Sequence, residues 1–212
     1  SEGRHIRSNI TMANRNTVGF GLIAQGVVGS TMASQGQGKY YIDSNHGSAM
    51  FQGTVVQSKA GYIVTSEAGR TSLTIGILNG IFYNDGTTLK PTFSNHYVAN
   101  TVPANSEDIT AFVIDNPMQL FAVGLDAAVT AADYGKTYGV TQAAAAGSTT
   151  SGQSSKQLNI GNASNTANTF RLLRSAEDPE NNDISVANST QIVCQNLNQY
   201  LQNTGTAGIT WQ

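Results

Sequence analysis

The sequence has few charged residues, one cysteine and no long apolar run, and each shortage excludes a class of protein. Charged residues make up 11% of the 212-residue chain, against roughly 25% in typical soluble domains. Helical proteins usually cover their exposed faces with Lys, Glu and Arg, so a surface of Ser, Thr, Asn and Gln favours strands and tight turns. No run of about 18 apolar residues occurs, so no membrane partner is expected.

Cysteine content and net charge further restrict the possible partners of the protein and the compartment in which it folds. The single cysteine, Cys194, excludes an internal disulfide framework. A formal net charge of −2 creates no field that would attract nucleic acid. Residues 1–30 do not resemble a secretory signal, because Asn14, Arg15 and Asn16 interrupt any apolar core. These features indicate folding in a cytoplasm-like compartment.

Residues 1–48 differ in pattern from the rest of the chain. Residues 19–29 are apolar but interrupted by glycines, and they have neither the 3.6-residue period of a helix nor the length of a clean strand. We predict that residues 1–48 form an extended N-terminal arm, laid over its own body or over a neighbour's surface. A short strand over residues 39–43 is expected to lead out of it.

Residues 49–117 carry regular strand signals and are predicted to form a first β-barrel-like unit. Strands are expected over residues 50–57, 62–65, 72–78 and 107–114. Leu73, Ile75 and Ile77 alternate with smaller or polar residues, which is typical of a half-buried strand. Asn79-Gly80 either makes a tight turn or lies within a longer strand, whereas Asn84-Asp85-Gly86 is the firmer turn prediction.

Residues 118–202 are predicted to form a second β unit, followed by a flexible tail over residues 203–212. Strands are expected over residues 118–125, 170–173 and 191–197. A short helix is expected within residues 126–134, where Thr130 and Asp133 have the spacing of a capping box. Residues 143–155 are low in complexity and are predicted to form a long polar, exposed loop. The predicted fold class is therefore all-β: one or two compact antiparallel barrel or sandwich units with an N-terminal arm and at most one short helix.

The sequence offers little catalytic or metal-binding chemistry. His5, His46 and His96 lie in unrelated polar contexts without the paired spacing of metal ligands. Cys194 lies in an apolar strand without an adjacent base, so we expect a buried, inert thiol. The carboxylates of residues 177–183 could bind Ca²⁺, but their spacing does not match a twelve-residue calcium loop, and a solvated turn is favoured. We therefore expect no catalytic residue, no metal site, no cofactor and no enzymatic activity.

Several segments, taken in order, resemble the capsid cement or decoration proteins of tailed phages of marine and cyanobacterial hosts. The chain differs from that pattern in its extension before Met12. The resembling segments are NRN (14–16) before Gly19 and Phe20, AMFQGTVV (49–56), IGILNGIFY (75–83), ITAFVIDNP (109–117), TAADYG (130–135), and RLLR (171–174) with DPEN (178–181).

The resemblance implies a virion structural protein, assembled in the host cytoplasm, that binds the outer surface of an assembled head and stabilises it by bridging major capsid subunits. It implies the major capsid protein as partner, together with neighbouring copies of the chain. We predict that the arm makes the contact. Its basic residues could meet phosphate or an acidic protein surface, or form a disordered tip, while its apolar residues anchor it. The predicted capsid-binding residues are Arg4, Arg7, Arg15, Phe20, Leu22, Ile23, Val27 and Val28.

The sequence leaves three alternative functions open. A tail-fibre or receptor-binding module would use the same low-charge polar surface to contact host glycans, although Tyr40-Tyr41, Phe82-Tyr83 and Tyr138 are scattered along the sequence. A β-fold hydrolase would need an acid–base constellation that distant carboxylates could form only in space. A shell-forming subunit of jelly-roll type is a third reading, and its copy number in the particle would distinguish it.

Overall fold

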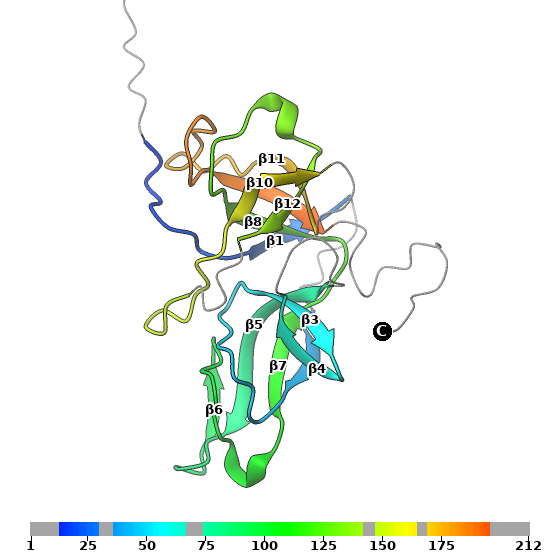
Figure 1. Cartoon of the computed structure of the whole chain (residues 1–212), viewed down its shortest axis with the longest axis vertical. Helices are drawn as coiled ribbons and strands as arrows, with labels where there is room; N and C mark the ends of the chain where they lie inside the picture. Colours follow the sequence, from blue (N-terminus) through cyan, green and yellow to red (C-terminus); the bar gives the residue numbers. More distant parts are fainter. Residues whose placement is uncertain (1–12, 30–35, 67–73, 142–146, 165–168, 196–212) are drawn as a thin grey trace, which may run out of the picture.

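The computed structural model describes residues 13–29, 36–66, 74–141, 147–164 and 169–195. Within them the chain is all-β and antiparallel, as predicted, and it forms two six-stranded sheets. Sheet A lies in the upper lobe of Figure 1 and sheet B in the lower lobe. No helix in these ranges has the length and apolarity needed to cross a bilayer.

Sheet A has the strand order β1-β8-β12-β11-β9-β10. An isolated bridge between Leu125, just after β8, and Leu158, the first residue of β10, brings the far strand back toward the middle of the sheet. Sheet A therefore curls around its own core. Its strands are β1 (Ile23–Val27), β8 (Gln119–Gly124), β9 (Thr137–Val140), β10 (Leu158–Ser164), β11 (Phe170–Ser175) and β12 (Thr190–Gln195).

Sheet B has the order β2-β7-β5-β3-β4, and β6 pairs with the other end of the long strand β5. Its outer strands β2 and β4 lie close together, so this sheet is curved as well. Its strands are β2 (Gly38–Ile42), β3 (Val55–Lys59), β4 (Tyr62–Thr65), β5 (Thr74–Asn84), β6 (Pro91–Ser94) and β7 (Ile109–Ile114).

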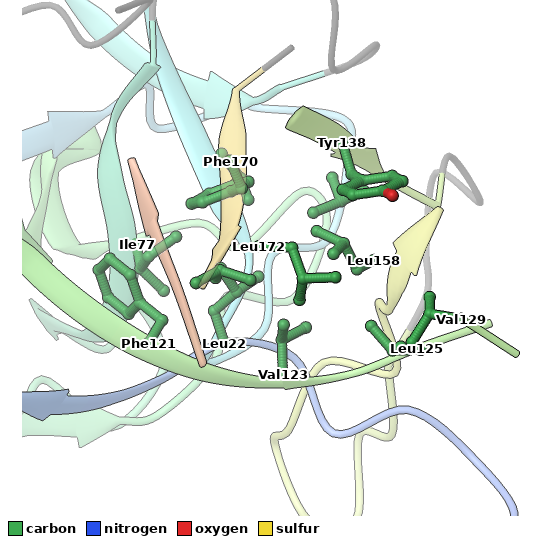
Figure 2. Packing of buried hydrophobic residues seen from close by; sticks show 13 residues of the cluster. Leu22, Ile77, Phe121, Val123, Leu125, Val129, Tyr138, Leu158, Phe170 and Leu172 are labelled. Carbon is green, nitrogen blue, oxygen red and sulfur yellow. The ribbon is translucent and has the colours of Figure 1, made fainter. Parts of the chain in front are cut away.

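Two hydrophobic clusters form the core, and one of them joins the sheets. The cluster within sheet B includes Ile75, Leu78 and Tyr97. The cluster within sheet A includes Phe121 and Phe170. Val55 and Ile77 belong to sheet B but pack into the cluster of sheet A, and Figure 2 shows Ile77 beside Phe121. The pairing of β5 shifts register between its β3 partners Val56 and Gln57 and again between Leu78 and Gly80. Such bulges redirect side chains, so that β5 places side chains in both clusters.

The predicted arm is part of the folded body wherever the structure describes it. Strand β1 pairs with β8 in sheet A, and β2 pairs with β7 in sheet B. The boundary at residue 48 is therefore corrected, because one strand of the predicted arm enters each sheet. Gly26 lies within β1 and other glycines flank that strand, which is why residues 19–29 lack the pattern of a clean strand. The change of sheet between β7 and β8 coincides with the predicted division at residues 117 and 118.

The short helix and the polar loop also differ from expectation. The described part of the chain contains two three-residue 3₁₀ helices, η1 (Ala104–Ser106) and η2 (Ala131–Asp133). The Thr130–Asp133 capping box is confirmed at η2. A hydrogen bond from the Lys136 amine, together with those from Thr130, lowers the pKa of Asp133 to about 2. In the predicted exposed loop 143–155, Gly152 and Ser154 are buried and Gln153 bridges to Gln52. The tail over residues 203–212 lies outside the described residues.

Candidate interaction surfaces

The N-terminal segment, residues 13–29, is held on its own body by a hydrogen-bonded clamp. Asn14 Nδ2 donates to the carbonyl oxygens of Asp183 and Ala187, both at 2.9 Å, and the Asp183 N–H donates to Asn14 Oδ1 at 3.1 Å. The main-chain N–H of Arg15 donates to the carbonyl oxygen of Glu180 at 3.1 Å. These bonds join positions about 170 residues apart in sequence, so the segment follows a defined path before β1.

The acidic loop, residues 177–183, forms the other half of this clamp. Its carboxylates already have protein partners: Asp178 accepts hydrogen bonds from Asn181 and Thr190, and Glu180 pairs with Arg15 at 2.7 Å. The Asn181 side chain lowers the pKa of Asp178. Among the described residues, no group of three or more His, Cys, Asp or Glu side chains is arranged to hold a metal ion. This geometry assigns the loop a structural role in fixing the N-terminal segment.

The predicted capsid-binding residues fall into four groups. Leu22 is only 3% exposed and belongs to the core of sheet A, so it is not available to a partner. Arg15 is exposed and pairs with the acidic loop, and Ile23 is 43% exposed. Arg4 and Arg7 lie outside the described residues. The remaining three are half-buried: Phe20, Val27 and Val28.

A second apolar surface, which the sequence analysis missed, lies at the β6 side of sheet B. We define the β6 surface as Leu89, Phe93, Val98 and Val102, all large apolar residues that are at least half exposed. Phe93 is 74% exposed and packs against Phe82 on β5, with ring centroids 4.6 Å apart. Pro91 begins β6, and a proline in a strand is found mainly at an edge or at the first residue. That signal could have identified this surface.

The described histidines, His46 and His96, and Cys194 are at least partly buried within the fold. His96 stacks on Phe51 with ring centroids 5.8 Å apart, and its Nδ1 lies within hydrogen-bonding distance of Ser94 and Asn95 side chains. Burial lowers the pKa of His46 and raises the pKa of the Cys194 thiol on β12. A raised thiol pKa leaves little reactive thiolate near neutral pH. His5 lies outside the described residues.

A cavity of about 280 Å³ lies between the two sheets, beside the N-terminal segment. Side-chain amides supply most of its polar groups. Gln119 lies within it at 1% exposure, and Gln52 Nε2 donates to Asn79 Oδ1 at 2.9 Å. Gln37 and Gln153 are exposed at the rim. The apolar lining comes from both sheets and the N-terminal segment: Phe20, Leu22, Ile23, Ala24, Leu78 and Ile114.

Close backbone contact forms one edge of this cavity. Gly21 and Gly53 both have positive φ angles, +76° and +86°. A Cβ on Gly53 would lie 3.0 Å from the nitrogen of Leu22, whose N–H donates to the carbonyl oxygen of Gly53. Only glycine allows both this conformation and this approach at low cost. The glycines that made the segment look irregular therefore seat it against sheet B.

Lys156 is the one buried amine among the described residues. It is 3% exposed, and its Nζ donates to the carbonyl oxygen of Thr141 at 3.2 Å. Burial lowers the pKa of this amine. Its carbonyl oxygen accepts a hydrogen bond from Gly21, so Lys156 also lies where the N-terminal segment meets the body.

Comparisons with protein-family models, with curated proteins and with solved structures found no match to this chain. What the surfaces can bind is therefore argued from their own geometry and chemistry.

Proposed function

We propose that this chain is a non-enzymatic capsid cement protein, which binds the outer surface of an assembled phage head and bridges major capsid subunits. The ordered segments that resemble such proteins suggest the setting. The observation that carries the proposal is the exposure of apolar side chains on both lobes. Val18 and Ile23 are exposed along the N-terminal segment, and the β6 surface is exposed on the other lobe.

Two apolar surfaces on one rigid body suit a bridging protein. Figure 1 places β1 in the upper lobe and β6 in the lower lobe, so the surfaces belong to opposite lobes. Exposed apolar residues are common singly, but four within residues 89–102, in β6 and the loops beside it, suggest a contact region. When one surface is bound, the second binds at a high effective concentration, so two modest contacts give strong attachment. Binding that occurs only on the assembled shell stabilises that shell.

Locating the protein in the particle tests the proposal directly. Virions of the phage that carries the gene are separated into heads and tails, and the chain is quantified by mass spectrometry relative to the major capsid protein. We expect it on heads, in a fixed ratio to that protein. Recovery on tails would favour the receptor-binding alternative and contradict the proposal.

A binding assay then tests the β6 surface. Heads from a strain lacking the gene are mixed with the full chain and sedimented. The double variant Leu89→Ser/Phe93→Ser removes exposed apolar area without disturbing either core cluster. We expect at least about tenfold weaker binding, because apolar anchors dominate interface energies. Val186→Ser is the matched control, since Val186 is exposed elsewhere on the molecule. Equal binding by the double variant and the control would exclude the β6 surface.

The N-terminal contribution requires a truncation that respects the fold. Deleting residues 1–30 would remove Leu22 from the core and β1 from sheet A. Deleting residues 1–12 leaves the Asn14 clamp intact. We expect this shorter deletion to weaken head binding if Arg4 and Arg7 contact the shell, and unchanged binding would exclude both of them.

A further inference from the structure

We propose that the cavity between the two sheets binds a neutral saccharide. This inference concerns small-molecule recognition and does not depend on attachment to a capsid. It rests on the chemistry of the cavity lining, its size, and a side-chain acceptor, Gln119 Oε1, that makes no hydrogen bond with another described residue.

The lining determines the charge of the ligand. Among the described residues that line the cavity, none carries an ionisable side chain. A charged ligand would lose its hydration without gaining an opposite charge, which is costly. A purely apolar ligand would bury the amides of Gln52, Asn79 and Gln119 without partners, which is costly too. A neutral ligand with many hydrogen-bonding groups avoids both costs.

Gln119 supplies the most specific feature. Its Nε2 donates to the carbonyl oxygens of Gly26, at 2.6 Å, and Leu120, at 3.2 Å. Both partners are acceptors, so the amide orientation is fixed and Oε1 remains an acceptor. Oε1 makes no hydrogen bond with another described residue, and Gln119, which is 1% exposed, lines the cavity, so this acceptor is available to a ligand there. A ligand hydroxyl is a donor that satisfies it.

The other amides and the apolar wall match the same ligand. In the Gln52–Asn79 pair, one hydrogen bond leaves both a carbonyl oxygen and amide hydrogens for a ligand. A hydroxyl both donates and accepts, so neighbouring hydroxyls can pair with such amides. Phe20 gives the cavity an aromatic surface, which suits the C–H face of a sugar ring. The volume of about 280 Å³ is at the small end of ligand pockets, so one or two sugar units would fit.

Titration of the full chain followed by ¹H–¹⁵N NMR tests the proposal. The probes are glucose, galactose, mannose and N-acetylglucosamine. Each is added up to about 50 mM, so that binding with a millimolar Kd can be detected. We expect at least one of them to shift the side-chain amide signals of Gln119 and Asn79. Glucuronate, which adds a negative charge to the same ring, is expected to bind at least about threefold more weakly.

Three exposed glutamines provide matched variants. Gln37→Ala and Gln153→Ala remove amides at the rim of the cavity, and neither side chain has a hydrogen bond among the described residues that the fold would lose. Each is expected to raise the Kd at least about threefold, since a neutral hydrogen bond is worth around 1 kcal/mol. Gln25→Ala alters an exposed glutamine on β1 that does not line the cavity, and it should leave the Kd unchanged.

Four results would overturn the inference: no shift with any of the four sugars, shifts confined to residues away from the cavity, equal affinity for glucuronate, or rim variants that bind like Gln25→Ala. Binding of a tetraglycine peptide as tight as that of the best sugar would also overturn it, because the cavity would then recognise main-chain amides. Since the head-binding assay uses other residues, failure here leaves the proposed function standing, and failure of that assay leaves the cavity proposal standing.

Discussion

At the scale of one residue, burial of the Lys156 amine lowers its pKa and affects the stability of the fold. Its amine is almost fully buried and donates to one carbonyl oxygen, that of Thr141. A buried ammonium loses several kcal/mol of hydration, and a single hydrogen bond recovers only part of that. The lowered pKa of Lys156 has this cause. Lys156 therefore opposes folding at neutral pH.

Replacing Lys156 with methionine tests this directly. Lys156→Met keeps most of the volume and removes the charge, so we expect it to raise the free energy of unfolding at pH 7 by about 1–3 kcal/mol. Because the folded-state pKa is lowered, the unfolded chain binds more protons between that pKa and 10.5. The wild-type protein therefore gains stability as pH rises through this window, and the advantage of the variant shrinks.

Urea unfolding from pH 6 to pH 10.5 measures this pH dependence. The control is Lys59→Met, which removes the same charge from an exposed position at the end of β3. We expect the control to change stability by no more than about 0.5 kcal/mol. Lower stability of Lys156→Met than of the wild type at pH 7 would show that the hydrogen bond to Thr141 outweighs the lost hydration.

At the scale of the element, the contact of the N-terminal segment with sheet B depends on glycine. Gly53→Ala introduces a methyl group at a positive φ angle and against the backbone of Gly21 and Leu22. Gly61 provides a matched control, because its φ is +88° and no atom lies within 4 Å of an added Cβ. Gly61→Ala therefore has the backbone strain without the steric contact.

Urea unfolding should separate the two effects. We expect Gly61→Ala to cost about 1 kcal/mol from the positive φ angle alone. Gly53→Ala should cost about 1–3 kcal/mol more, because the added methyl group overpacks a tight contact. Equal losses for the two variants would mean that the segment moves away easily, and that its position beside the cavity is not fixed by this contact.

The clamp before β1 makes a second prediction at this scale. Asn14→Ala removes three buried or partly buried hydrogen bonds to residues 183 and 187. We expect a loss of about 1–3 kcal/mol and faster hydrogen exchange in β1. Arg15→Ala removes an exposed ion pair and should cost less than about 0.5 kcal/mol. If Arg15→Ala accelerates hydrogen exchange in β1 more than Asn14→Ala does, Arg15 and not Asn14 holds the N-terminal segment in place.

Sequence patterns predicted some strands well and missed others for a physical reason. The strand over residues 62–65 was predicted at the bounds of β4, and the expected strand over 39–43 differs from β2 by one residue at each end. Strand β9 was missed because all four of its residues are buried, so it has no alternation. Strand β10 was missed because Asn159, Gly161 and Asn162 make it read as a loop.

The candidate sites were harder to predict than the strands, because they join distant parts of the chain. Gln119 and Gln37 look like ordinary polar residues in sequence, and only the meeting of the two sheets gives them a common cavity. Leu22 was assigned to a partner because an apolar segment without periodicity gives no sign of where it packs. Its burial depends on β1 joining sheet A, which is a contact with residues about 100 positions away.

At the scale of the whole molecule, the two sheets share a core and should unfold together. Ile77 belongs to β5 of sheet B but lies beside Phe121 in the cluster of sheet A (Figure 2). Ile81, on the same strand and equally buried, packs only within the cluster of sheet B. Because Ile77 connects the cores of the two lobes, we expect a substitution at Ile77 or Ile81 to lower the free energy of unfolding of the whole protein.

Ile77→Ala and Ile81→Ala form a matched pair for testing this coupling. Each deletes the same buried atoms, so we expect each to lower the free energy of unfolding by about 2–5 kcal/mol. In scanning calorimetry both variants should keep one transition, with the calorimetric enthalpy equal to the van't Hoff enthalpy. If the lobes were independent, Ile81→Ala would shift a transition of sheet B and leave a second one unmoved. A single transition in both variants would show that the core that Ile77 shares between the sheets couples the unfolding of the two lobes.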